Sequence, residues 1–165
     1  MARTAQITTF ESAYIAPGRP LAARLRVLKA NRPRALLIDD DVHLLETFRG
    51  VLRSEFEVDV ATGGRTGLDA LASDAAYDVI VCDVQMPDVD GMQVYRELRR
   101  RDPDQARRLL FFTGGIPHGE IGRIVAAGEP IVVHKPCTRA HLLGAMQRVM
   151  TAAAAAAVSS PDRGR

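Results

Sequence analysis

The chain has no tryptophan, and aromatic residues make up only 5% of its 165 residues. Its core must therefore be built mainly from Leu, Val, Ile and Ala. The two cysteines, Cys82 and Cys137, have neither disulfide-framework nor metal-site spacing, so we interpret them as reduced thiols in a cytoplasmic protein. No apolar run approaches the roughly 20 residues of a membrane helix, and the N-terminus lacks the apolar stretch of a secretory signal. We therefore expect no membrane association.

The net charge of +2 is unevenly distributed along the chain. Residues 1–34 hold seven basic side chains and one acidic one, so residues 35–165 are net acidic. A basic segment can contact nucleic acid, but no recognition-helix motif is present and we do not predict nucleic-acid binding. We interpret residues 1–32 as a basic N-terminal extension with a short helix at 20–30. That helix could pack on the rest of the chain or on a second copy, which leaves a homodimer open.

From residue 33 onwards, short apolar runs alternate with helical spacing. The runs at 35–38, 79–82, 109–112 and 131–133 are typical of strands buried on both faces. Residues 56–60 alternate apolar and acidic side chains, as an edge strand does. Helical spacing follows each strand, at 42–52, 65–73, 92–101, 117–127 and from 138 onwards. This order predicts an α/β fold with a five-stranded parallel sheet and helices on both faces.

The predicted domain covers residues 33–151. The alanine run at 152–157 is expected to extend the last helix, because alanine has the highest helix propensity. The remaining residues, to 165, are expected to form a disordered tail. No effector domain is recognisable after the last helix, so we expect a protein that stands alone and acts either by contact with other proteins or as one step of a longer relay.

Polar residues follow four of the five predicted strands: Asp39 and Asp40, Asp83, Thr113, and Lys135. In an open parallel sheet, ligands bind outside the carboxyl ends of the strands, so we expect these side chains to converge. Three carboxylates in one pocket repel each other unless a cation is present. A hard divalent cation such as Mg²⁺ prefers oxygen ligands of this kind. A carboxylate beside such an ion can attack a phosphoryl group and form an acyl phosphate.

As a set, these motifs resemble the response-regulator receiver family of two-component signalling systems. The matching segments are Leu-Ile-Asp-Asp-Asp at 37–41, Val-Cys-Asp-Val-Gln-Met-Pro at 81–87, Asp-Gly at 90–91, Phe-Thr-Gly at 112–114 and His-Lys-Pro at 134–136. The resemblance covers about residues 33–151 and implies the flavodoxin-like fold with strand order 2-1-3-4-5.

The resemblance also implies roles for individual residues. Asp83 would be the phosphoacceptor. Asp40 would bind Mg²⁺ directly, together with Asp83 and the backbone carbonyl of Gln85, and Asp39 would act mainly through water. Lys135 would pair with the phosphoryl group.

Two further positions concern the activation switch of this family. Thr113 would hydrogen-bond the phosphoryl group and move on activation. Three residues before Lys135 the family usually has an aromatic ring that swings inward when the threonine moves, but this chain has Val132 there. A valine has no ring that could swing inward, so it cannot signal activation in that way.

By this resemblance, the chain takes a phosphoryl group from a histidine kinase or a histidine phosphotransfer protein and passes the signal to a downstream protein, without being an enzyme itself. One alternative is a pseudo-receiver that binds partners independently of phosphorylation, an idea motivated by Val132 and the basic extension. Another is a Mg²⁺-dependent phosphohydrolase of the haloacid dehalogenase type. Such hydrolases usually have a second Asp two residues after the nucleophile, where this chain has Gln85.

Overall fold

The computed structural model describes residues 32–73, 76–115, 122–124 and 130–159. The chain divides into two units between Arg32 and Pro33, and every strand and helix described here lies in the second unit. The predicted helix at 20–30 therefore lies outside the described residues. So does the predicted helix at 117–127, apart from residues 122–124, which are helical.

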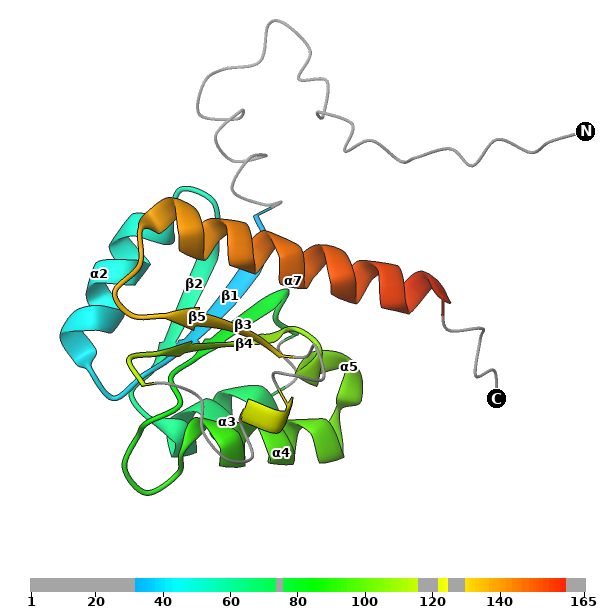
Figure 1. Ribbon diagram of the computed structural model, residues 1–165, viewed down its shortest axis with the longest axis horizontal. Helices are drawn as coiled ribbons and strands as arrows, with labels where there is room; N and C mark the ends of the chain where they lie inside the picture. Colours follow the sequence, from blue (N-terminus) through cyan, green and yellow to red (C-terminus); the bar gives the residue numbers. More distant parts are fainter. Residues whose placement is uncertain (1–31, 74–75, 116–121, 125–129, 160–165) are drawn as a thin grey trace, which may run out of the picture. The chain divides into compact units, whose positions relative to one another are not determined.

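A single parallel sheet forms the centre of the domain (Figure 1). Its five strands are β1 (Arg34–Ile38), β2 (Glu57–Ala61), β3 (Val79–Cys82), β4 (Leu109–Thr113) and β5 (Ile131–His134). The strand order is β2-β1-β3-β4-β5, and all neighbouring strands are parallel. The predicted fold class and strand order are therefore confirmed, and β2 is an edge strand as its alternating pattern indicated.

Helices cover both faces of this sheet. They are α2 (Val42–Leu52), α3 (Gly64–Ala72), α4 (Gly91–Arg101), the short α5 (Pro103–Ala106) and α7 (Arg139–Ser159). In Figure 1, α2 and α7 lie on one side of the sheet, and α3, α4 and α5 lie on the other. The helix α5 was not predicted. It begins at a proline after Asp102, whose carboxylate accepts a hydrogen bond from the backbone of Gln105, a common way to start a helix.

The alternation of side chains along the strands divides the core into two layers. Leu36, Ile80 and Phe111 belong to the layer that includes α4. The next residues along the same strands, Leu37, Val81 and Phe112, pack in the layer under α2 and α7. Both layers consist largely of aliphatic side chains, as the scarcity of aromatic residues predicted. Cys82 is buried, and neither cysteine forms a disulfide.

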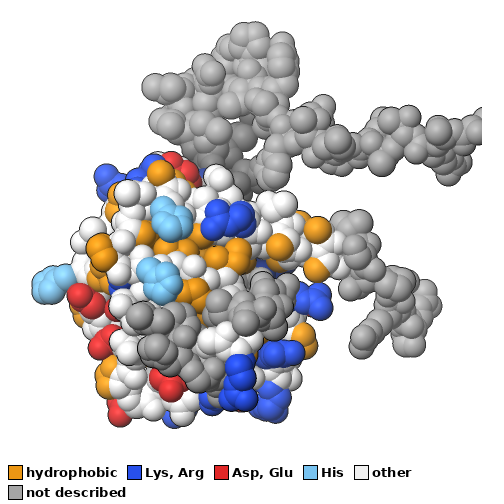
Figure 2. Space-filling view, viewed as in Figure 1, with side chains coloured by type: hydrophobic (Ala, Val, Ile, Leu, Met, Phe, Trp, Pro, Cys, Tyr) orange, Lys and Arg blue, Asp and Glu red, His pale blue; other side chains and the backbone are white. Residues whose placement is uncertain are grey.

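Several basic side chains gather around the carboxyl end of α4. The last turn of α4 carries Arg99, Arg100 and Arg101, and Figure 2 shows Lys and Arg side chains gathering over α4 and α5. Cations at the carboxyl end of a helix complement its dipole, which accounts for their position. Within the described ranges, none of the helices is both long and apolar enough to span a membrane.

Candidate functional site

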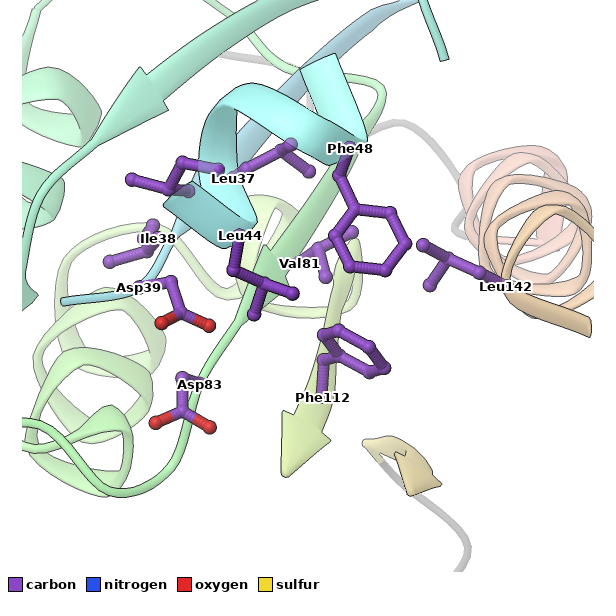
Figure 3. Close-up of a pocket in the computed structure, with 10 residues that line it drawn as sticks. Leu37, Ile38, Asp39, Leu44, Phe48, Val81, Asp83, Phe112 and Leu142 are labelled. Atoms are coloured by element: carbon purple, nitrogen blue, oxygen red, sulfur yellow. The ribbon is translucent and has the colours of Figure 1, made fainter. Parts of the chain in front are cut away.

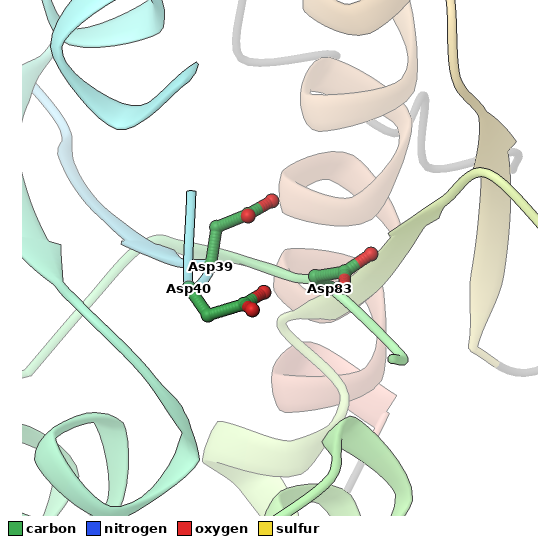
Figure 4. A group of neighbouring side chains, drawn as sticks. All are labelled: Asp39, Asp40 and Asp83. Carbon is green, nitrogen blue, oxygen red and sulfur yellow. The ribbon is translucent and has the colours of Figure 1, made fainter. Parts of the chain in front are cut away.

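Three carboxylates meet at the carboxyl edge of the sheet. Asp39 and Asp40 follow β1, Asp83 follows β3, and these two strands are hydrogen-bonded neighbours. One carboxylate oxygen from each residue lies within 4.8 Å of the others (Figure 4). Asp39 and Asp83 are buried, each with 5% of its surface exposed, whereas Asp40 is exposed to solvent. The structure therefore brings together the three acids that the sequence predicted.

Lys135 reaches this cluster from β5, at the far edge of the sheet. Its ammonium nitrogen lies 2.6 Å from Oδ2 of Asp39 and 3.1 Å from Oδ1 of Asp83. The lysine side chain is itself only 23% exposed. The ammonium group thus partly neutralises two buried carboxylates that would otherwise repel each other.

The pKa values of Asp83 and Lys135 reflect this arrangement. Burial raises the pKa of Asp83, and the charge of Asp39 adds to the increase, while Lys135 opposes both. Burial alone would lower the pKa of Lys135, but its hydrogen bonds to Asp39 and Asp83, together with the charges of these carboxylates, outweigh burial and raise it. The lysine is therefore held in its charged form beside the carboxylates.

The backbone around Asp83 is fixed by a close approach of α4. Asp83 donates its backbone N–H to the carbonyl of Ile38, and Gly91 donates to the carbonyl of Val84. A Cβ atom at Gly91 would lie 2.1 Å from the backbone oxygen of Asp83. Only glycine can therefore start α4 this close to the residue.

The neighbouring helix also starts at the site. Asp41 caps α2 by accepting a hydrogen bond from the backbone N–H of Leu44. Asp41 in turn donates its own backbone N–H to Oδ1 of Asp39 at 2.9 Å. The cap and the acidic cluster thus share one short segment, and this segment orients the Asp39 carboxylate.

Three further residues were predicted at the site: Thr113, Gln85 and Val132. Thr113 ends β4 and is buried, and its hydroxyl accepts a hydrogen bond from the backbone of Gly115. Among the described residues, no hydrogen bond joins Thr113 to Asp83. The backbone N–H of Gln85 donates to Oδ2 of Asp83 at 3.0 Å. Val132 is half-buried on β5 and packs against the core layer that includes α4.

Sequence reasoning missed one residue at the site, Phe112. The Nζ atom of Lys135 lies 5.2 Å from the centre of the Phe112 ring. The ring also borders a small cavity whose walls include Asp39 and Asp83 (Figure 3). No local sequence pattern could have indicated this contact, because it depends on the side-chain conformations of residues at the ends of two different strands.

Comparison with known proteins finds similarity over more than half of the chain. Residues 35–147 match the family described as the response regulator receiver domain. The chain is 32% identical over 118 residues to the probable transcriptional regulatory protein SilR of Salmonella typhimurium. The match covers 71% of this chain and 50% of SilR. The chain thus spans about half the length of the curated relatives that it matches.

Solved structures give the same fold. The chemotaxis protein CheY4 of Vibrio cholerae is 28% identical, with a TM-score of 0.61 over 72% of this chain and 98% of CheY4. The receiver domain of a sensor histidine kinase from Pseudomonas aeruginosa is 26% identical, with a TM-score of 0.62 over 73% of this chain and 98% of that domain. In that structure a magnesium ion is coordinated in the active-site cleft.

Proposed function

This chain belongs to the family of response regulator receiver domains, and on that premise we propose that Asp83 is the residue that accepts a phosphoryl group. The donor would be a histidine kinase or a histidine phosphotransfer protein. The phosphorylated chain would then act on a downstream protein by contact, as a regulator rather than as an enzyme that turns over a substrate.

The placement of Lys135 is the observation that carries this proposal. A lysine from β5 lies within 3.1 Å of carboxylates that follow β1 and β3, so three strands supply one site. Phosphoryl transfer depends mostly on positioning and on neutralising charge. A buried carboxylate with an ammonium group beside it supplies both a nucleophile and a partner for the phosphoryl oxygens.

The residues of the cluster also fit a magnesium ion. The clustered carboxylates of Asp39, Asp40 and Asp83 offer the oxygen ligands that Mg²⁺ prefers. The backbone carbonyl of Gln85 is proposed as a fourth ligand. When bound, the ion neutralises charge that develops on the transferring phosphoryl group.

The side chains of this protein would act as follows. A carboxylate oxygen of Asp83 forms a bond to phosphorus as the bond between phosphorus and the donor's histidine nitrogen breaks. The ammonium group of Lys135 exchanges its contact with Asp83 for a contact with a phosphoryl oxygen. The hydroxyl of Thr113 would leave its hydrogen bond with Gly115 and donate to another phosphoryl oxygen.

Intact-mass spectrometry after incubation with acetyl phosphate and Mg²⁺ tests the proposal. We expect one phosphoryl adduct on the native chain and none on Asp83→Asn. The matched control is Asp59→Asn, which removes a carboxylate that pairs with Arg34 outside the acidic cluster, and this variant should still form the adduct.

Three results would contradict the proposal. An adduct on Asp83→Asn would place the acceptor elsewhere. A correctly folded native chain that accepts nothing from acetyl phosphate or from a phosphorylated histidine phosphotransfer protein would favour binding that is independent of phosphorylation. Repeated release of phosphate from a phosphomonoester would favour a hydrolase.

A further inference from the structure

The ring of Phe112 faces the ammonium group of Lys135. Their separation of 5.2 Å lies within the range of cation–π attraction, which extends to about 6 Å. Phe112 is only 4% exposed, so water screens this contact weakly. The ammonium group therefore has three attractive partners: two carboxylates and one aromatic face.

Phe48 of α2 holds the Phe112 ring in place. The two ring centres are 5.2 Å apart and the ring planes are perpendicular, which is a favourable edge-to-face geometry. Figure 3 shows these rings side by side, with Leu44 and Leu142 close to them. Packing around the rings leaves a cavity of only about 10 Å³, about enough for one water molecule. The Phe112 ring therefore has little space in which to move.

Lysine side chains are flexible, with several rotatable bonds that must be ordered before the ammonium group can act. Two hydrogen-bonded carboxylates fix the end of the lysine side chain only while both remain available as partners. In the proposed transfer, Asp83 becomes an acyl phosphate, and Lys135 must exchange one of these partners. The aromatic contact, like the ion pair with Asp39, does not change in that step.

We propose that Phe112, supported by Phe48, is a positioning residue that holds the Lys135 ammonium group over the acidic cluster. The part of this inference that concerns transfer rests on the proposed function of Asp83. The part that concerns the position of Lys135 applies to the unphosphorylated protein as well.

The chain offers a closely matched control for this proposal. Phe111 precedes Phe112 on β4 and is fully buried, but it lies in the other core layer, where its ring packs against Tyr95 with centres 5.9 Å apart. Phe112→Leu and Phe111→Leu make the same chemical change one residue apart. Only Phe112→Leu removes the ring from Lys135.

The experiment has two readouts. The first is the NMR signal of the Lys135 side-chain ammonium group in the unphosphorylated protein, which a nearby ring shifts. The second is the rate of phosphorylation by acetyl phosphate at saturating Mg²⁺, with the unfolding midpoint measured for each variant. Phe112→Tyr serves as the variant that keeps the ring.

We expect Phe112→Leu to move the Lys135 signal and to slow phosphorylation about three- to tenfold. Phe112→Tyr should keep a rate close to that of the native chain. Phe111→Leu should lower the unfolding midpoint by a similar amount but leave both the signal and the rate within about twofold of the native values.

Equal losses of rate in the two leucine variants would show that Phe112 acts only through stability and would overturn the inference. An unmoved Lys135 signal in a folded Phe112→Leu variant would also overturn it. If that variant does not fold, Phe48→Leu, at a half-buried position on α2, must slow phosphorylation at an unchanged Mg²⁺ affinity. A native chain that accepts no phosphoryl group would contradict the proposed function, whereas the NMR readout would still decide the position of Lys135.

Discussion

At the scale of single residues, the site is an arrangement of like charges held together by one opposite charge. Burial raises the pKa of Asp83, so its ionised form is less favourable in the folded protein than in water. Lys135 offsets part of that cost through its contacts with Asp83 and Asp39. A carboxylate kept ionised in an unfavourable place is a better nucleophile than one that is fully solvated, which fits the proposed role of Asp83.

The backbone oxygen of Asp83 leaves no room for a side chain at position 91. We expect Gly91→Ala to destabilise the fold by about 1–3 kcal/mol, because the new methyl group would overlap the backbone oxygen of Asp83. The variant should also accept phosphoryl groups more slowly, since Asp83 has to move. Chemical denaturation and the mass-spectrometric assay measure the two effects.

Gly50→Ala is the control for this prediction. Gly50 lies inside α2, and a Cβ atom there would have nothing within 4 Å. The substitution should stabilise the protein by about 0.5–1 kcal/mol, because alanine favours the helix more than glycine. A Gly91→Ala variant as stable and as active as the native chain would show that α4 can shift away from Asp83 at no cost.

At the scale of elements, the sequence predicted the strands and most helices because their apolar runs are short and clearly bounded. It predicted the meeting of Asp39, Asp83 and Lys135 because parallel strands place their carboxyl ends at one edge. It did not predict α5, whose four residues are too few to show a period. The contact between Phe112 and Lys135 depends on side-chain conformations from two different strands, and no local pattern records these.

A contact between α2 and α7 provides a test at this scale. Arg139, the first residue of α7, donates to the carbonyl of Val51 at 3.1 Å and to the carboxylate of Glu55 at 2.5 Å. The hydroxyl of Ser54 and then the guanidinium group of Arg139 lower the pKa of Glu55. A carboxyl group with a lowered pKa in the folded state stabilises the fold above its unfolded pKa, and this contribution is lost as the pH falls through the folded value.

We therefore expect Glu55→Gln to lower the melting temperature by about 1–3 °C at pH 7, a small effect because both partners are partly exposed. The difference from the native chain should disappear in acid, once Glu55 is protonated in both states. Glu46→Gln, which breaks an exposed pair with Arg49 inside α2, is the control and should have a smaller effect. A difference that persists at low pH would assign the stabilisation to packing rather than to charge.

At the scale of the whole molecule, the site depends on the order of the strands. The carboxylates come from the central strands β1 and β3, and the lysine comes from β5 at one edge of the sheet. A ligand that binds the acidic cluster therefore stabilises the whole fold, because the cluster exists only when the sheet is assembled.

This reasoning predicts the effect of Mg²⁺ on thermal stability. At ten times its dissociation constant, the ion should raise the melting temperature of the native chain by about 2–5 °C. Asp40→Asn should lose most of this shift, and Asp69→Asn, which changes an exposed acid on α3, should keep it. Differential scanning fluorimetry with and without EDTA measures the shifts. An equal response in the two variants would argue against Asp40 as a ligand.

The hydrogen bond between Lys135 and Asp39 joins residues that are 96 positions apart in the chain. During synthesis, the acidic residues leave the ribosome well before the lysine does, and β5 is the last strand to become available. A nascent chain that ends before residue 135 can carry all three acids but not their counter-charge. We therefore expect incomplete chains not to accept phosphoryl groups from phosphodonors, so that only a complete domain can be phosphorylated.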